Sequence, residues 1–270
     1  MKAWGRFLSA FTLTSRIPVR FSFTFDPGRM DLYLPLAGIF PALLGGAVWA
    51  GGLFFLGGGI VTMLLALAAQ YLAFNLFHLD GLMDTADAFW GGNNPEKRLA
   101  ILKDSRIGVY GFFAGLALLS LKGGLLMELR PLISRYPAAV LAYPISGRIS
   151  AALVPAFTPP RNETGLGSLL KGARPLWTLA GGIIALSLWS ALVYGIRLAL
   201  HPYPAFRPGP PALLPLLSAI PLSAPAVSLL LARTYQRGIG GYTGDALGAA
   251  VELGEALHLG AAFAVWHMPL

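Results

Sequence analysis

Seven apolar segments, each close to the length that crosses a lipid bilayer, constrain the fold of this chain more than any other feature. A membrane helix needs about 20 mostly apolar residues, and it satisfies its own backbone hydrogen bonds. Only 12% of the residues are charged, against about 25% in an average soluble domain. The sequence therefore predicts an all-α polytopic membrane protein, a bundle of about seven transmembrane helices. We place the spans near residues 32–56, 60–79, 108–129, 136–157, 176–198, 211–231 and 246–266.

No stretch between these spans is long enough to form a separate soluble domain. We therefore expect residues 1–270 to form a single membrane domain. Residues 1–30 are basic and rich in aromatic residues, which predicts an amphipathic segment at the membrane interface, with Trp4, Phe7 and Phe11 on its apolar side. Cysteine is absent, which excludes disulfides and thiolate metal sites.

Lysine and arginine are unequally divided between the two sides of the predicted bundle. With a cytoplasmic N-terminus, fourteen of them lie on the cytoplasmic side and four on the other side. The positive-inside rule then predicts a multi-pass membrane protein whose acidic stretch, described below, lies on the cytoplasmic side. Its cytoplasmic loops would be residues 80–106, 158–175 and 232–245. The formal charge of +8 fits this topology and the binding of phosphates or anionic head groups, so we expect no nucleic-acid partner.

Two basic residues, Lys122 and Arg148, fall within predicted spans. A charge in lipid is costly, so Arg148 is expected either to face the protein interior or an aqueous cavity, or to extend its side chain to the interface.

The stretch from Phe77 to Tyr110 contains five of the twelve acidic residues of the chain. Asp80, Asp84 and Asp87 have the spacing i, i+4, i+7, which places them in one row on a helix. Carboxylates this close repel one another and require a compensating cation or bound protons. A Mg²⁺ ion held by carboxylates and substrate phosphates meets this requirement. The alternatives are acidic residues that favour a helix N-terminus, or a solvated loop.

Two other predicted loops carry residues that suit the same site. Residues 158–175 combine several glycines with Arg161, Lys171 and Arg174, as phosphate-binding loops do, although an ordinary positive-inside loop has the same composition. Asp245 and Glu252 lie at the mouth of the last span, where the small residues of 244–254 allow close helix packing.

Isolated carboxylates are unfavourable at the mouth of a membrane helix, so we expect Asp245 or Glu252 to share a metal with the aspartate row. Their carboxylate oxygens would then lie roughly 4–8 Å from those of the row. The alternative is that Glu252 pairs with an arginine such as Arg148 and holds spans together.

The segments HLDGLMDTADAF, LAILKDSRIGVYG and GGYTGDALGAAVELGEAL resemble hallmark stretches of the cobalamin synthase family. LTSRIPVR and YLPLAGIFPALLGG resemble the start of that family, so the resemblance covers nearly the whole chain. One departure is Ala88, where the family more often has glycine. The resemblance implies an adenosylcobinamide-GDP ribazoletransferase that depends on Mg²⁺. Such an enzyme transfers the cobinamide phosphate of adenosylcobinamide-GDP to α-ribazole, or to its 5′-phosphate, and releases GMP. The resemblance also implies a multi-pass protein of a prokaryotic inner membrane, with its active site facing the cytoplasm.

Candidate roles follow from combining this chemistry with the residue patterns. Asp84 and Asp104 are the candidate catalytic residues, with Asp104 either a further ligand or the base. The metal candidates are Asp80, Asp84, Asp87, Asp245 and Glu252. The candidates for substrate binding are Lys103, Arg106, Arg161, Lys171, Arg174 and His78. His78 is alternatively a satisfied histidine at the interface.

Two other functions remain open at this point. A CDP-alcohol phosphotransferase-like enzyme also activates a diphosphate with aspartates of a membrane helix. However, Asp84-Thr85 stands where that pattern has Ala-Arg. A cation transporter could use intramembrane carboxylates as an ion path. The acidic residues of this chain cluster at one face of the predicted membrane instead.

Overall fold

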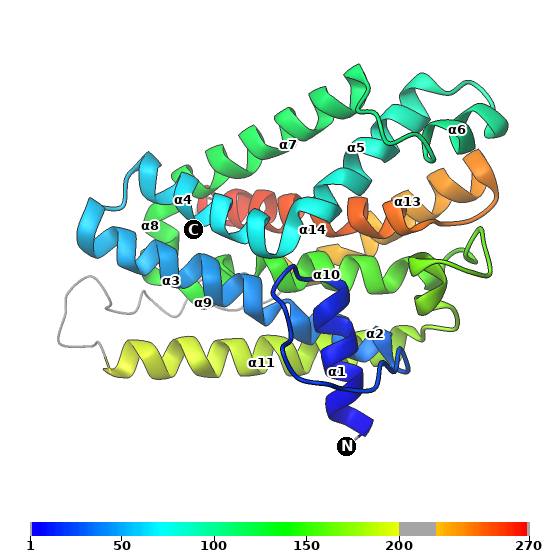
Figure 1. Cartoon of the computed structure of the whole chain (residues 1–270). Coiled ribbons are helices and arrows are strands. Elements are labelled where there is room, and N and C mark those ends of the chain that lie inside the picture. Colours follow the sequence, from blue (N-terminus) through cyan, green and yellow to red (C-terminus); the bar gives the residue numbers. More distant parts are fainter. Residues whose placement is uncertain (1, 200–219, 269–270) are drawn as a thin grey trace.

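Long helices lying side by side make up the computed structural model, which describes residues 2–199 and 220–268 (Figure 1). Within these ranges there is no strand, and one isolated bridge joins Pro160 to Tyr242. Six helical stretches are long and apolar enough to cross a membrane. The predicted all-α, polytopic membrane architecture is therefore confirmed.

The six candidate spans follow the predicted order. They are Met30–Leu56, Ile60–Gly91, Val109–Glu128, Pro137–Ala156, Pro175–Ala199 and Gly244–Trp266. The main helices of these spans are α2 (Met30–Ala37), α3 (Ile39–Leu56), α4 (Ile60–Gln70), α5 (Leu76–Gly91), α7 (Val109–Glu128), α10 (Tyr143–Leu153), α11 (Pro175–Ala199) and α14 (Gly244–Trp266). The other elements are α1 (Lys2–Leu13), α6 (Pro95–Ile101), α8 (Arg130–Arg135), α9 (Pro137–Val140), the 3₁₀ turns Val154–Ala156, Leu166–Leu170 and Ile220–Ser223, and α13 (Ala224–Ile239).

The predicted span 211–231 lies partly outside the described residues. Its described part is the turn Ile220–Ser223 and the first half of α13, an amphipathic helix of 16 residues. In Figure 1, α11 runs away from the end of the bundle at which α14 begins, and α13 returns to that end. The chain therefore crosses back between Ala199 and Gly244, in keeping with an odd number of crossings.

Two predicted loops are shorter than expected because helices continue into them. The region 80–106 was expected to be a loop, but α5 continues to Gly91 and α6 follows. Apolar residues between the aspartates, such as Leu82 and Ala86, are buried and keep this stretch helical. Asn94 caps α6 by accepting a hydrogen bond from the amide of Lys97. Likewise, only residues 240–243 separate α13 from α14.

The centre of the bundle is the contact between α10 and α14. Glycines make it close: a Cβ at Gly147 would lie 2.5 Å from the carbonyl oxygen of Val251, and one at Gly254 would lie 3.0 Å from Cα of Gly147. The prediction that the small residues of 244–254 permit a close helix approach is confirmed.

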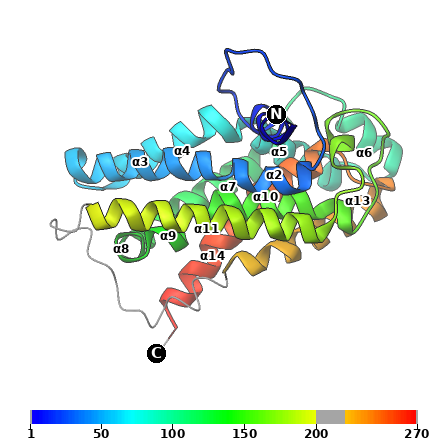
Figure 2. The same cartoon turned by 90° about the horizontal axis from the view of Figure 1, so that it is seen from below.

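The N-terminal helix α1 runs across the long helices and not along them (Figures 1 and 2). Phe11 packs against Phe40 and Phe74, with ring centroids at 4.9 and 6.2 Å. Trp4 is 58% exposed. The helix is thus attached to the bundle by one aromatic face, and its place at a membrane interface stays a prediction.

Candidate active site

Asp80, Asp84 and Asp245 gather where α5 packs against the start of α14. Gly81 faces α14 so closely that a Cβ there would lie 3.0 Å from Cα of Asp245. Asp84 is near enough to Asp80, Asp245 and Asp87 to be repelled by all three, and Asp80 also repels Asp245. The structure thus brings together aspartates from two segments that are far apart in the sequence.

The carboxylates of this cluster have no basic side chain among the described residues to balance them. In the described part of the chain, none of the three aspartates forms an ion pair. Asp80 is exposed, while Asp84 and Asp245 are half-buried. The hydroxyl of Thr243 donates a hydrogen bond of 3.0 Å to Asp245 Oδ2. Among residues 2–199 and 220–268, no three acidic or histidine side chains are arranged as a ready-made metal centre. A cation bound here would therefore need further oxygen ligands from elsewhere.

Asp87, the third member of the predicted row, contacts a different helix. Its two carboxylate oxygens accept hydrogen bonds of 2.8 Å from the amides of Gly108 and Gly111. These amides lie at the N-terminus of α7, where backbone donors lack partners within the helix. The contacts describe Asp87 as a cap that joins α5 to α7, and a metal role for it stays a prediction.

Helix α13 covers another side of α5. Tyr235 lies with its hydroxyl 2.7 Å from the hydroxyl of Thr85, and Arg98 of α6 donates to the carbonyl of Gly238 at 3.3 Å. Tyr235 was not among the sequence candidates.

Asp104 and Arg106 pair with each other at the surface. The guanidinium of Arg106 donates to Asp104 Oδ2 at 2.6 Å, and its backbone amide donates to Oδ1 at 3.1 Å. These bonds lower the pKa of Asp104 to about 2. A carboxylate of such low pKa has little tendency to take a proton near neutral pH. Of the two roles considered for Asp104, the structure disfavours the general base.

The other basic candidates are exposed and lie at two places. Arg161 is beside the start of α14, where its amide donates to the carbonyl of Tyr242 at 2.8 Å. Lys171 forms an ion pair with Glu163, and the amide of Arg174 donates to Asp31 at the start of α2. Lys171 also lines a polar cavity of about 190 Å³ together with Arg29 and Asp31. Of these three residues, Arg161 is the one whose backbone bonds to the segment just before α14, the helix that carries Asp245. Lys103 is exposed beside the Asp104–Arg106 pair.

His78 is buried between α5 and α14. Its side chain is 4% exposed, and within the described residues its Nδ1 has no hydrogen-bond partner. Both the substrate-binding role of His78 and its alternative as a satisfied histidine at the membrane interface therefore stay predictions.

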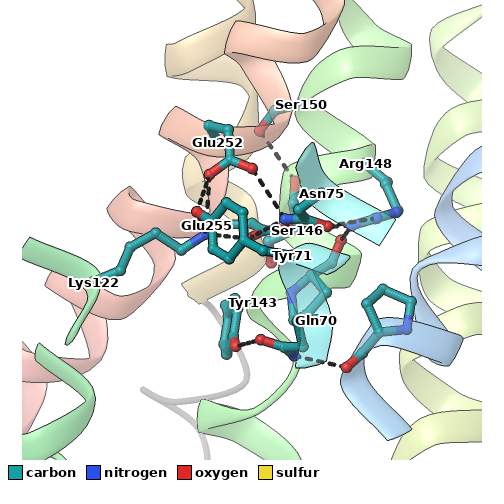
Figure 3. Close-up of polar contacts among 12 residues, drawn as sticks. Gln70, Tyr71, Asn75, Lys122, Tyr143, Ser146, Arg148, Ser150, Glu252 and Glu255 are labelled. Carbon is teal, nitrogen blue, oxygen red and sulfur yellow. Dashed lines mark hydrogen bonds and ion pairs between the residues drawn. The ribbon is translucent and has the colours of Figure 1, made fainter. Parts of the chain in front are cut away.

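Glu252 lies in a separate cluster of buried charges (Figure 3). Its oxygens accept hydrogen bonds from Tyr71 at 2.6 Å, Asn75 at 3.0 Å and Lys122 at 3.1 Å. It is seven residues beyond Asp245, or about 10 Å along the helix axis. These contacts favour the alternative in which Glu252 holds spans together and does not bind the metal. Its basic partner is Lys122 and not the arginine that was expected.

Arg148 belongs to the same cluster and is fully buried. It donates to Glu255 and to the side chain of Asn75, both at 3.1 Å. The expectation that Arg148 faces the protein interior is confirmed. Asn75 and Tyr71 were missed, although polar side chains within an apolar span are themselves a signal of function.

Comparison with known proteins identifies relatives along nearly the whole chain. Residues 6–263 match the model of the family described as cobalamin-5-phosphate synthase. The chain is 34% identical over 272 residues to an adenosylcobinamide-GDP ribazoletransferase of Sinorhizobium medicae, covering 96% of this chain and 95% of the relative. It is 31% identical over 276 residues to the Vibrio cholerae protein of the same name, covering 93% of this chain and 90% of the relative. The Pseudoalteromonas atlantica protein of that name is 32% identical over 261 residues, with 93% and 87% covered. No solved structure matches.

Proposed function

Because the chain belongs to the cobalamin-5-phosphate synthase family, we propose that it is an adenosylcobinamide-GDP ribazoletransferase. It transfers the cobinamide phosphate of adenosylcobinamide-GDP to α-ribazole, or to its 5′-phosphate, and releases GMP. The observation that carries this proposal is the alignment with relatives of that name over 93% and 96% of the chain. These relatives give no support to the CDP-alcohol phosphotransferase or cation-transporter alternatives.

The donor atoms of the aspartate cluster fit a Mg²⁺ ion. Mg²⁺ prefers oxygen ligands and is usually held by one or two carboxylates together with substrate phosphates and water. Asp80, Asp84 and Asp245 supply such carboxylates and have no cationic partner in the described part of the chain. A shared site of this kind needs no preformed group of three protein ligands. When bound, the ion neutralises charge on the diphosphate and stabilises the leaving phosphate.

The side chains near this site are candidates for proton transfer and for phosphate binding. Asp84 is half-buried and without an ion pair, so it is our candidate to accept the proton of the attacking hydroxyl. Arg161 extends from the loop beside α14 and is our first candidate for a contact with phosphate oxygens. Lys103 and Arg106 are exposed and available for the same purpose if the substrate displaces Asp104 from its ion pair.

The orientation of the site follows from where the basic loops lie. The region around α6, the segment after α10 and the turn between α13 and α14 lie at one end of the bundle (Figure 1). The first two regions hold seven basic residues, Lys97, Arg98, Lys103, Arg106, Arg161, Lys171 and Arg174, whereas the described residues near the opposite end of the bundle include Arg130, Arg135 and Arg197. By the positive-inside rule, this end faces the cytoplasm of a cell whose inner membrane holds the protein.

The test is GMP release by the purified protein in detergent. The protein is supplied with adenosylcobinamide-GDP and either α-ribazole or its 5′-phosphate, with and without Mg²⁺. We expect GMP release that depends on Mg²⁺ and is lost in Asp245→Asn. The matched control is Glu128→Gln, an exposed acid at the far end of α7. Folded wild-type protein that releases no GMP from either acceptor would contradict the proposal.

A further inference from the structure

The helical stretch Ile60–Gly91 contains one π-helical turn, Tyr71–Asn75, shortly before the aspartates. There the amide of Leu76 donates to the carbonyl of Tyr71, five residues earlier. The carbonyl of Ala73 accepts instead from the amide of Arg16, at 2.7 Å. A π-turn accommodates one residue more than an α-turn, so it changes the direction of every later side chain by about 100°.

A network of buried charges holds the two ends of this turn against α14 (Figure 3). Tyr71 donates to Glu252 at 2.6 Å, and Asn75 donates to Glu252 and Glu255 at 3.0 Å. Lys122 from α7 balances both glutamates, with its Nζ at 3.1 Å from Glu252 and 2.5 Å from Glu255.

Arg148 from α10 completes the charge balance of the network. It lies 3.1 Å from Glu255 and also donates to Asn75 Oδ1 at 3.1 Å. All four charged side chains are at most 1% exposed, so the loss of one partner leaves a charge that water cannot reach.

The consequence for the active site can be read from the order of residues on α5. Without the π-turn, each later residue would take the place of its successor. Asp80 would then occupy the position of Gly81, where a Cβ lies 3.0 Å from Cα of Asp245. Asp84 would occupy the position of Thr85, which faces Tyr235 of α13. A regular helix of this sequence could not pack on α14 and present its aspartates to Asp245 together.

We infer that the π-turn, held by this charge network, sets the rotation of α5 that makes Asp80 and Asp84 face Asp245. Asn75 and Lys122 are thus positioning residues for the site, and they need not touch substrate. The inference deepens the proposed function and relies on it only for the activity measurement.

A direct readout of the rotation is available because the chain has no cysteine. Leu79→Cys is the reporter, since Leu79 is 9% exposed and would move to the exposed position of Asp80 if the π-turn were lost. Trp90→Cys is the reference, since Trp90 is 61% exposed and its successor is exposed as well. Labelling by a water-soluble maleimide is measured in detergent alongside GMP release.

The test variants are Asn75→Leu and Lys122→Met, which remove network contacts and keep the chain length. We expect the Leu79→Cys reporter to become reactive in both, while labelling at Trp90→Cys stays constant. GMP release should fall about 100-fold, as expected for misplaced reacting groups. The matched control is Ser146→Ala, which removes a buried hydrogen bond of 2.7 Å to His258 of α14 without touching α5. It should leave labelling and GMP release unchanged.

A second change should reverse the effect. Deletion of Leu72, which is 64% exposed within the π-turn, leaves a regular helix whose later residues return to their present positions. Combined with Asn75→Leu, this deletion should again protect the Leu79→Cys reporter from labelling. It should also raise GMP release at least ten-fold above that of Asn75→Leu alone. A purely structural role of Asn75 predicts no such recovery.

Two results would overturn the inference. One is lost activity in Asn75→Leu and Lys122→Met with an unchanged labelling pattern; the other is unchanged labelling and activity in both. If Lys122→Met yields no monodisperse protein, Asn75→Leu alone decides between these outcomes. A wild-type protein that releases no GMP would count against the proposed function, while the labelling experiment would still decide on the rotation.

Discussion

Gly81 of α5 and Gly248 of α14 are in backbone contact, so that a Cβ at Gly248 would lie 3.4 Å from Cα of Gly81. Gly81 lies within the aspartate row of α5, and Gly248 lies between Asp245 and Glu252 on α14. It keeps the two helices close enough for their aspartates to act on one ligand.

We expect Gly81→Ala to separate these helices, because the added methyl group meets backbone atoms at 3.0 Å. GMP release should fall about 100-fold, and the free energy of unfolding should decrease by about 1–3 kcal/mol. Gly124→Ala is the control, since a Cβ there meets no atom within 4 Å. Equal activity of the two variants would show that the close approach is not needed.

Asp84→Asn and Asp87→Asn should differ in what they damage. Asp84→Asn should remove GMP release at an unchanged melting temperature, and any residual activity should need about 10–100-fold more Mg²⁺. Asp87→Asn turns an NH₂ group toward one of the two α7 amides, so it should lower stability by about 1 kcal/mol. Activity and Mg²⁺ titrations are compared with thermal unfolding. Loss of activity in Asp87→Asn without destabilisation would assign Asp87 to the metal as well.

Asp104→Asn should not change the shape of the pH profile. Its bonds to Arg106 depress the pKa of Asp104 to about 2. The ion pair is therefore fully formed above the pKa of an ordinary aspartate, about 4, and is lost only as the pH falls through about 2. Between about pH 5 and pH 9 the carboxylate therefore gains no proton. GMP release by the variant should parallel that of the wild type over this range. Disappearance of an acidic limb would restore Asp104 as the base.

Sidedness can be tested with single cysteines in intact cells. Asn94→Cys and Thr164→Cys lie in the basic regions and should react with an impermeant reagent only after the inner membrane is opened. A reporter fused after Leu270 should be active outside the cytoplasm, because an odd number of crossings separates it from α1. Labelling of Asn94→Cys from outside would reverse the topology.

The hydropathy pattern was sufficient to predict the six spans found in the described residues, because each one must be apolar over a fixed length. The spacing of Asp80, Asp84 and Asp87 correctly indicated a helix. It could not show that Asp87 accepts hydrogen bonds from the amides at the N-terminus of α7, since this depends on where α7 begins in space. The fit of Asp245 against α5 was predictable from the small residues around it.

The position of Glu252 was harder to predict, for a physical reason. Its spacing from Asp245 suggested one site, but its partners are Tyr71, Asn75 and Lys122 from other spans. The π-turn that presents two of these partners is stabilised by tertiary contacts, among them the bond from Arg16 to Ala73. No local pattern of residues encodes such a turn.

The buried network also has a consequence for the order in which the protein is made. Both of its carboxylates are on α14, whereas its cations, Lys122 and Arg148, are on helices synthesised earlier. Glu252 follows its partner Asn75 by 177 residues in the sequence, and Glu255 follows its partner Lys122 by 133 residues. Until the last helix inserts, two positive charges in the nascent bundle lack their carboxylate partners. An unfinished chain thus carries unpaired charges within the bilayer, which are energetically costly, and the carboxylates of α14 remove this cost.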